Sequence, residues 1–209
     1  MKRRARSRGI RNPVRNAILF GLATVVGAVL ALLGAADIRA TGREGSPLLA
    51  GLVPMGLCLI FFVHYVSKIR VFRDMQAGRT AIARWTLPAA QFSRFCEEER
   101  RIPPGSVLVN FYKPPRTVPA DGVEVIFSSD GVLIGDGYFP LSPTSGRRLQ
   151  SVRYIASDPP AIEFGMAFST KIQTFTYRAL ESLRVPVATD HRSEAGTVVR
   201  RYQAIIGRL

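Results

Sequence analysis

The sequence predicts an α+β membrane protein, in which an N-terminal transmembrane helical hairpin precedes an antiparallel β-rich barrel or sandwich with a C-terminal capping helix. Two uncharged apolar runs, at residues 17–36 and 47–67, each have the length of about 20 residues that a membrane-spanning helix needs. Short alternating apolar segments separated by turn residues then dominate the rest of the chain. These patterns divide the chain into a basic tail (1–16), the hairpin (17–67), a helix beside the membrane (68–79) and one β-rich domain (80–209).

Basic residues flank both apolar runs. Seven Lys and Arg residues and no acid precede the first run, whereas the loop between the runs has two basic and two acidic residues. Five basic residues and one acid follow the second run, within residues 68–85. Because Lys and Arg are retained on the cytoplasmic side, both termini are expected in the cytoplasm and the loop outside. Each run is expected to be an α-helix, since a backbone in hydrocarbon must satisfy its own hydrogen bonds.

A cleaved secretory signal peptide is the alternative for the first run, because a basic segment precedes it and small residues end it. The apolar core of a signal peptide is about 7–15 residues long, which is shorter than this run. In either case the basic flank of the second run holds the C-terminal domain in the cytoplasm.

The net charge of +14 and the pI near 10.9 are also typical of proteins that bind nucleic acid. Residues 1–16 hold +7 and residues 68–85 hold +4, which leaves only +3 for residues 86–209. The excess charge therefore lies beside the predicted membrane, and no nucleic acid partner is expected. The expected partner is the lipid bilayer, because each basic side chain near anionic headgroups contributes about 1 kcal/mol to binding.

Small residues recur every four positions along the first run, at Ala23, Gly27, Ala31 and Ala35. Such a stripe lets a second helix approach closely. The partner expected first is the second run of the same chain, which supplies Gly51 and Gly56, and homodimerisation through the stripe is the alternative. No acidic or basic residue lies inside either run, which argues against an ion-coupled transporter or channel.

The segment after the second run is expected to begin with a helix and a strand. Residues 68–79 continue the helical pattern as far as Gly78, and residues 80–86 then alternate as a strand that includes Trp85.

An amphipathic helix is expected next, with Pro88 in its first turn and residue 101 near its end. Its apolar side includes Phe92 and Phe95, and the acidic run at residues 97–99 is expected in solvent. If these two rings and the Trp85 indole are buried they belong to the core, and if exposed they mark a surface for a partner.

Strand patterns follow the Pro-Pro-Gly break at residues 103–105. Apolar and polar residues alternate along these strands, which predicts antiparallel sheets with one buried face and one solvent-exposed face. The strands are expected at residues 107–112, 123–128, 132–134, 138–141, 149–156, 161–169 and 171–180. Asp136–Gly137 is expected to form a hairpin turn, since Gly supplies the positive φ that such turns need.

An amphipathic helix closes the chain. Asp190 is expected to cap its N-terminus, and Gly207 to lie just past its end. Its apolar side contains Ala195, Val198, Val199, Tyr202, Ile205 and Ile206.

This layout resembles bacterial two-span membrane proteins whose cytoplasmic part is a pleckstrin-homology (PH)-like or YcxB-like domain. The resemblance rests on the hairpin, the ARWT segment (83–86) with Phe92 and Phe95, the SSDGVLIGDGYFPL stretch (128–141) and the LRVPV segment (183–187). It implies a PH-like barrel with a capping helix, in a protein of the bacterial inner (plasma) membrane. The strand and helix expected over residues 80–101 depart from a minimal PH barrel.

The sequence contains none of the common catalytic signatures: no G-x-S-x-G elbow, phosphate-binding loop or dinucleotide fingerprint. Cys58 and Cys96 fall in the membrane and in the cytoplasm respectively, so both are expected to stay reduced and to pack as apolar residues. Two histidines offer no zinc-binding spacing. No catalytic residue, cofactor or metal ligand is therefore predicted.

Basic residues in expected turns are the strongest binding candidates: Lys113, Arg116, Arg147 and Arg148. A PH-like fold would expose them, so they suit an anionic phospholipid or an acidic peptide, with solubility and local ion pairing as the alternative. The expected function is a non-catalytic, membrane-anchored binding or scaffold module whose target is a protein partner, a second copy or the inner leaflet. The alternative function is an enzyme with an unrecognised site in the β-rich domain, which a pocket with convergent polar groups would favour.

Overall fold

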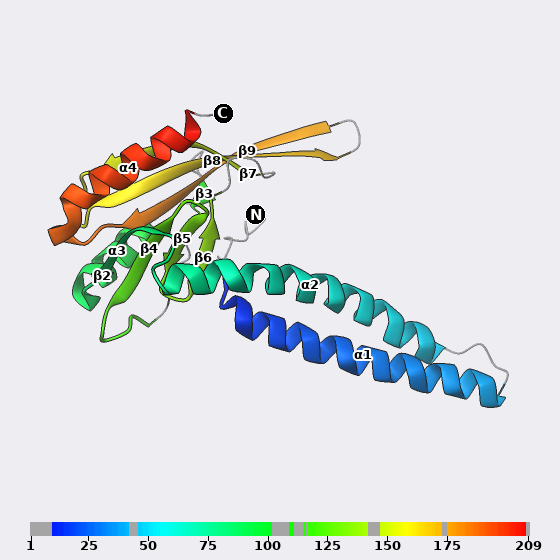
Figure 1. The fold of residues 1–209 in the computed structure, drawn as a ribbon. Helices are drawn as coiled ribbons and strands as arrows, with labels where there is room; N and C mark the ends of the chain where they lie inside the picture. Colours follow the sequence, from blue (N-terminus) through cyan, green and yellow to red (C-terminus); the bar gives the residue numbers. More distant parts are fainter. Residues whose placement is uncertain are drawn as a thin grey trace. The chain divides into compact units, whose positions relative to one another are not determined.

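A computed structural model describes residues 10–41, 46–101, 109–110, 115, 117–141, 147–172 and 175–207. The chain has an α+β layout, with two long apolar N-terminal helices, antiparallel sheets and a C-terminal helix, as predicted (Figure 1). It divides into two compact units, Arg11–Arg73 and Asp74–Leu209, and the second unit also includes Met1–Ile10.

The first unit is a pair of long helices. α1 spans Pro13–Thr41 and α2 spans Ser46–Gln76, so both helices continue past the apolar runs into their polar flanks. Less exposed positions recur along α2 in alternating steps of three and four residues, at Leu48, Gly51, Met55, Cys58, Phe62 and Tyr65. This 3.5-residue spacing is typical of two helices that pack along their lengths.

A five-stranded sheet has the order β1-β6-β5-β4-β2, and all of it except Arg11 of β1 belongs to the second unit. Its strands are β1 (Ile10–Arg11), β2 (Ala81–Leu87), β4 (Val123–Ser128), β5 (Gly131–Ile134) and β6 (Gly137–Pro140). Neighbours from β2 to β6 are antiparallel, as the alternating pattern predicts.

The turn between β5 and β6 differs from the prediction by one residue. Gly135 has a φ of +59° and Gly137 already belongs to β6, so the turn is formed by Gly135 and Asp136. The prediction placed the positive φ at the second glycine, whereas the structure uses the first turn position, as in type II′ hairpins.

A four-stranded sheet has the order β3-β9-β8-β7. Its strands are β3 (Val109–Asn110), β7 (Arg147–Ile155), β8 (Ala161–Ile172) and β9 (Phe175–Pro186), and the last three form an antiparallel meander. β3 pairs parallel with β9, so the prediction of antiparallel pairing is wrong for this strand. The two strands are far apart in the sequence, and no hairpin fixes their relative direction.

Two α-helices complete the unit, α3 (Ala89–Arg101) and α4 (Arg192–Ile206). The prediction that Asp190 caps α4 is wrong, because a 3-10 turn η1 (Thr189–His191) precedes the helix and His191 occupies the N-cap without a side-chain cap bond. Gly207 does lie at the C-cap, where its N–H donates to the Gln203 carbonyl.

One hydrophobic core joins both sheets with α3 and α4. The Trp85 indole is 2% exposed, and Phe92 and Phe95 are fully buried, so these rings belong to the core and do not mark a partner surface. Trp85 Nε1 donates to the Pro186 carbonyl at 3.2 Å, which links β2 to the end of β9. α4 packs against β7 and β2, the edge strands of the two sheets.

Candidate functional site

Among the described residues, nearly all exposed large apolar side chains lie on α1 and α2. Nine lie on each helix, with exposed fractions from 41% at Leu52 to 70% at Leu32, and Tyr154 is the single one elsewhere. Soluble proteins rarely expose so large a contiguous apolar surface. Both helices are long and apolar enough to cross a membrane, and only 22% and 6% of their most apolar windows are buried.

Three of the predicted small residues meet at a close contact between α1 and α2. A Cβ atom at Gly51 would lie 2.4 Å from the Ala31 nitrogen and 2.8 Å from the Gly27 carbonyl oxygen. Ala35 is half-buried, Ala23 is exposed, and nothing lies within 4 Å of a Cβ at Gly56. The two helices of one chain therefore contact each other through Gly27, Ala31 and Gly51.

Aromatic rings form a second contact between α1 and α2. The Phe20 ring lies 5.1 Å from the Phe61 ring and 5.5 Å from the Tyr65 ring, measured between centroids. Stacked rings at such distances stabilise a contact beyond their buried area.

An open groove of about 320 Å³ lies on the helix pair. It is lined by Leu30, Leu33, Gly34, Asp37 and Ala50. One ionisable residue among apolar ones is not the set of convergent polar groups that a catalytic pocket needs.

The four predicted basic residues are not shown as one site. Lys113 and Arg116 lie outside the described residues. Arg147 and Arg148 begin strand β7 instead of occupying a turn, and Arg148 is exposed opposite Ala167 of β8.

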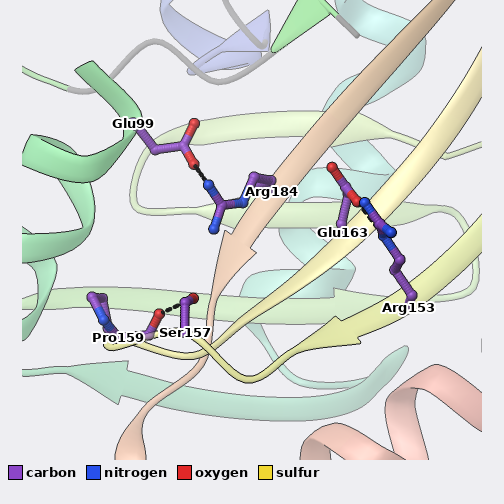
Figure 2. Close-up of polar contacts among 6 residues, drawn as sticks. All are labelled: Glu99, Arg153, Ser157, Pro159, Glu163 and Arg184. Carbon is purple, nitrogen blue, oxygen red and sulfur yellow. Dashed lines mark hydrogen bonds and ion pairs between the residues drawn. The ribbon is translucent and has the colours of Figure 1, made fainter. Parts of the chain in front are cut away.

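A buried ion pair joins α3 to β9 (Figure 2). Glu99 Oε1 lies 2.9 Å from an Arg184 guanidinium nitrogen, and the two side chains are 0% and 14% exposed. The prediction that residues 97–99 face solvent is therefore wrong for Glu99. The sequence could have indicated this burial. Glu99 follows Phe92 by seven positions and Phe95 by four, so it lies on the same helix face as these two buried rings.

Charge continues from this pair across the four-stranded sheet (Figure 2). Glu163 of β8 is the register partner of both Arg184 on β9 and Arg153 on β7, and it forms an ion pair with Arg153. Acidic and basic residues thus alternate along one row from α3 to β7. Beside this row, the Ser157 hydroxyl donates to the Pro159 carbonyl at 2.7 Å between β7 and β8.

Buried hydroxyl groups fix the turn between β4 and β5. The Tyr202 hydroxyl of α4 donates to the Ser128 carbonyl, and the Tyr138 hydroxyl donates to the Asp130 carbonyl at 3.1 Å. Burial raises the pKa of Tyr138 to about 12, with a smaller contribution from Asp130, and burial also raises the pKa of Tyr202. Both phenols are therefore neutral hydrogen-bond donors: Tyr202 holds α4 to the end of β4, and Tyr138 holds β6 to the β4–β5 turn.

His191 lies at the start of α4. Its Nδ1 atom is 3.1 Å from a Glu194 carboxylate oxygen, and its ring stacks on Trp85 at 5.9 Å between centroids. These contacts attach the first turn of α4 to β2.

Neither cysteine forms a disulfide: Cys58 is half-buried and Cys96 is buried. Burial raises the pKa of the Cys96 thiol to about 11, Arg100 opposes this shift, and Glu99 and Glu97 add to it. Within the described ranges, no three His, Cys, Asp or Glu residues gather to hold a metal ion.

We expect the β-rich unit to lose stability at alkaline pH. A thiol or phenol whose pKa is raised by folding stabilises the folded state fully below its unfolded pKa, and this contribution is lost as pH rises through the folded pKa. For Cys96 that window runs from 9.0 to about 11. The fluorescence of Trp85, the single tryptophan, should therefore report a melting temperature in detergent that falls from pH 9 to pH 11.

The variant Cys96→Ala is the matched test of this pH dependence. The melting temperature of this variant should fall less steeply over the same pH range. At pH 8 it is expected to be lower than that of the natural chain, because removal of the thiol leaves a cavity. An equal slope in the variant and the natural chain would contradict the role of the thiol.

No protein-family model, curated protein or solved structure compared with this chain matches it.

Proposed function

We propose that this chain is an integral membrane protein of the bacterial inner membrane, in which α1 and α2 span the bilayer and both termini lie in the cytoplasm. The observation that carries the proposal is the outward apolar surface of the helix pair, with nine large exposed side chains on each helix. Hydrocarbon is the environment in which such a surface is stable, and the self-satisfied backbone of a helix suits it. The basic flanks of both helices support the orientation.

We propose further that the β-rich unit is a PH-like, non-catalytic binding module held at the cytoplasmic surface. The antiparallel neighbours β2-β4-β5-β6 in one sheet and the meander β7-β8-β9 in the other support the PH-like assignment, together with the final helix against the edge strands β2 and β7. The described buried polar groups Glu99, Arg184, Tyr138 and Tyr202 all make contacts that hold the fold together, so their role is structural.

Alkaline extraction and cysteine labelling test the anchor and its orientation. Bacterial membranes that contain the chain are washed with sodium carbonate, and the protein should stay in the pellet. In a Cys58→Ala background, Thr41→Cys at the end of α1 should react with an impermeant maleimide in intact cells, whereas Gln203→Cys on α4 should react only after lysis. Release by carbonate, a mature protein without α1, or the reverse labelling pattern would contradict the proposal.

A further inference from the structure

The open groove on the helix pair lies near the end where α1 finishes and α2 begins (Figure 1). Leu30, Leu33, Gly34 and Asp37 line it from α1, and Ala50 lines it from α2. Asp37 and Ala50 each lie four residues from this end of their helix, which is about 6 Å at a rise of about 1.5 Å per residue. The groove therefore runs from near the end of the hairpin toward its apolar middle.

The two ends of this groove differ in chemistry. Asp37 is the first charged residue after the uncharged run at residues 17–36, and it lines the end nearer to the helix termini. Leu33 and Leu30 line the groove about 6 Å and about 10 Å further along α1. A ligand that complements both ends has a cationic group joined to an apolar chain.

The size and the depth of the groove suit part of a lipid molecule. Its volume of about 320 Å³ is near the lower limit of small-molecule sites, which run from about 300 to 1,000 Å³, so it holds a segment of an acyl chain and not a whole lipid. On the proposed topology this end of the hairpin lies in the leaflet that faces away from the cytoplasm. Asp37 would then be at the level of the headgroups, and Leu30 and Leu33 at the level of the acyl chains.

We infer that this groove binds a phospholipid whose headgroup ends in a primary ammonium group, with the ammonium at Asp37 and one acyl chain against Leu30 and Leu33. The inference rests on the proposed function, because a membrane-spanning hairpin is what brings the groove to the lipid.

The charge of Asp37 selects among phospholipid headgroups. A primary ammonium group has three N–H donors, and its bonds to a carboxylate are stronger than those between neutral groups. Asp37 already takes part in a polar interaction of the chain, and the two oxygens of a carboxylate can accept further bonds. A trimethylammonium headgroup has no N–H to donate, and an anionic headgroup is repelled by the carboxylate.

Native mass spectrometry of the full chain tests this lipid preference. The protein is released from detergent in the presence of equimolar phosphatidylethanolamine, phosphatidylcholine and phosphatidylglycerol with the same acyl chains, and each bound lipid is quantified. We expect phosphatidylethanolamine to be retained about three- to tenfold over each of the other two, which is the effect of about one net hydrogen bond.

Three variants separate the headgroup contact from the acyl-chain contact. Asp37→Asn keeps the size of the side chain and removes its charge, so it should abolish the preference while the total amount of bound lipid stays similar. Ala50→Leu places a larger side chain in the groove and should lower the retention of all three lipids. Ala36→Leu is the matched control, because Ala36 is exposed like Ala50 but does not line the groove, and it should change neither quantity.

Free ethanolamine, which is the headgroup without its chains, should not displace the bound lipid, since it lacks the part that contacts the leucines. Three outcomes would overturn the inference while leaving the anchor intact. They are equal retention of the three lipids by the natural chain, an unchanged preference in Asp37→Asn, and displacement of the lipid by free ethanolamine. Release of the protein from membranes by carbonate would instead contradict the proposed function itself.

Discussion

Replacing Glu99 with leucine is expected to lower the free energy of unfolding of the β-rich unit by about 3–5 kcal/mol, because it removes the carboxylate from a buried ion pair. The Arg184 guanidinium is 14% exposed and would lose the carboxylate that lies 2.9 Å away. Urea unfolding of the full chain in detergent, followed by Trp85 fluorescence, measures the change.

Two further variants show whether burial is the cause. Glu99→Leu combined with Arg184→Met should recover most of the loss, since buried ion pairs are often replaced by apolar residues at little cost. Glu124→Gln is the surface control, because the Glu124–Arg84 pair has a similar separation of 2.6 Å but side chains 38% and 47% exposed. Its expected cost is about 0–1 kcal/mol, and equal losses at Glu99 and Glu124 would contradict the prediction.

Replacing Gly51 with alanine is expected to separate α1 from α2. The new Cβ atom would meet the Ala31 nitrogen at 2.4 Å, and a backbone atom cannot move aside as a flexible side chain does. Overpacking of this kind costs about 1–3 kcal/mol. A loss of about 1.4 kcal/mol would lower the population of the packed pair about tenfold.

Disulfide trapping measures this loss in the full chain. A Cβ built at Gly27 would lie 3.0 Å from Met55 Cβ, which is about 0.5 Å closer than in a disulfide, so a small displacement should let Gly27→Cys and Met55→Cys oxidise within one chain in a Cys58→Ala background. Gly51→Ala should slow this oxidation about tenfold. Gly56→Ala is the matched control, since nothing lies within 4 Å of its Cβ. Oxidation mainly between two chains would favour homodimerisation instead.

Patterns that depend on near neighbours in the sequence predicted much of the fold. The apolar runs located α1 and α2, and two-residue alternation located β4 at its observed bounds and the neighbouring strands within a few residues. Strand ends were harder to place, since β8 and β9 continue to Ile172 and Pro186 across positions where the apolar alternation weakens. The parallel pairing of β3 depends on a strand about 70 positions away, which no local pattern encodes.

The candidate site was predicted less well than the fold. The charge of Glu99 led to the prediction that its side chain is exposed to solvent, although its helical spacing placed it with Phe92 and Phe95. Its partner Arg184 lies 85 positions later in the chain, beyond the reach of a local pattern. Asp190 had the correct residue type for a cap, but the 3-10 turn moved the start of α4 past it. The first error arose where a tertiary contact, the Glu99–Arg184 pair, overrides a local preference, and the second where a local turn displaces the helix start.

The position of α4 against the edge strands β2 and β7 also sets the order in which the protein can mature. Trp85 and Pro186 are 101 positions apart, and the Tyr202 contact to Ser128 spans 74. The unit therefore cannot close until the last part of the chain has been synthesised. On the proposed topology the N-terminal helices enter the bilayer first, and the 126 residues from the end of α2 at Gln76 to Tyr202 are synthesised afterwards. At about 5–20 residues per second this takes roughly 6–25 s, during which the nascent β-strands wait at the membrane surface.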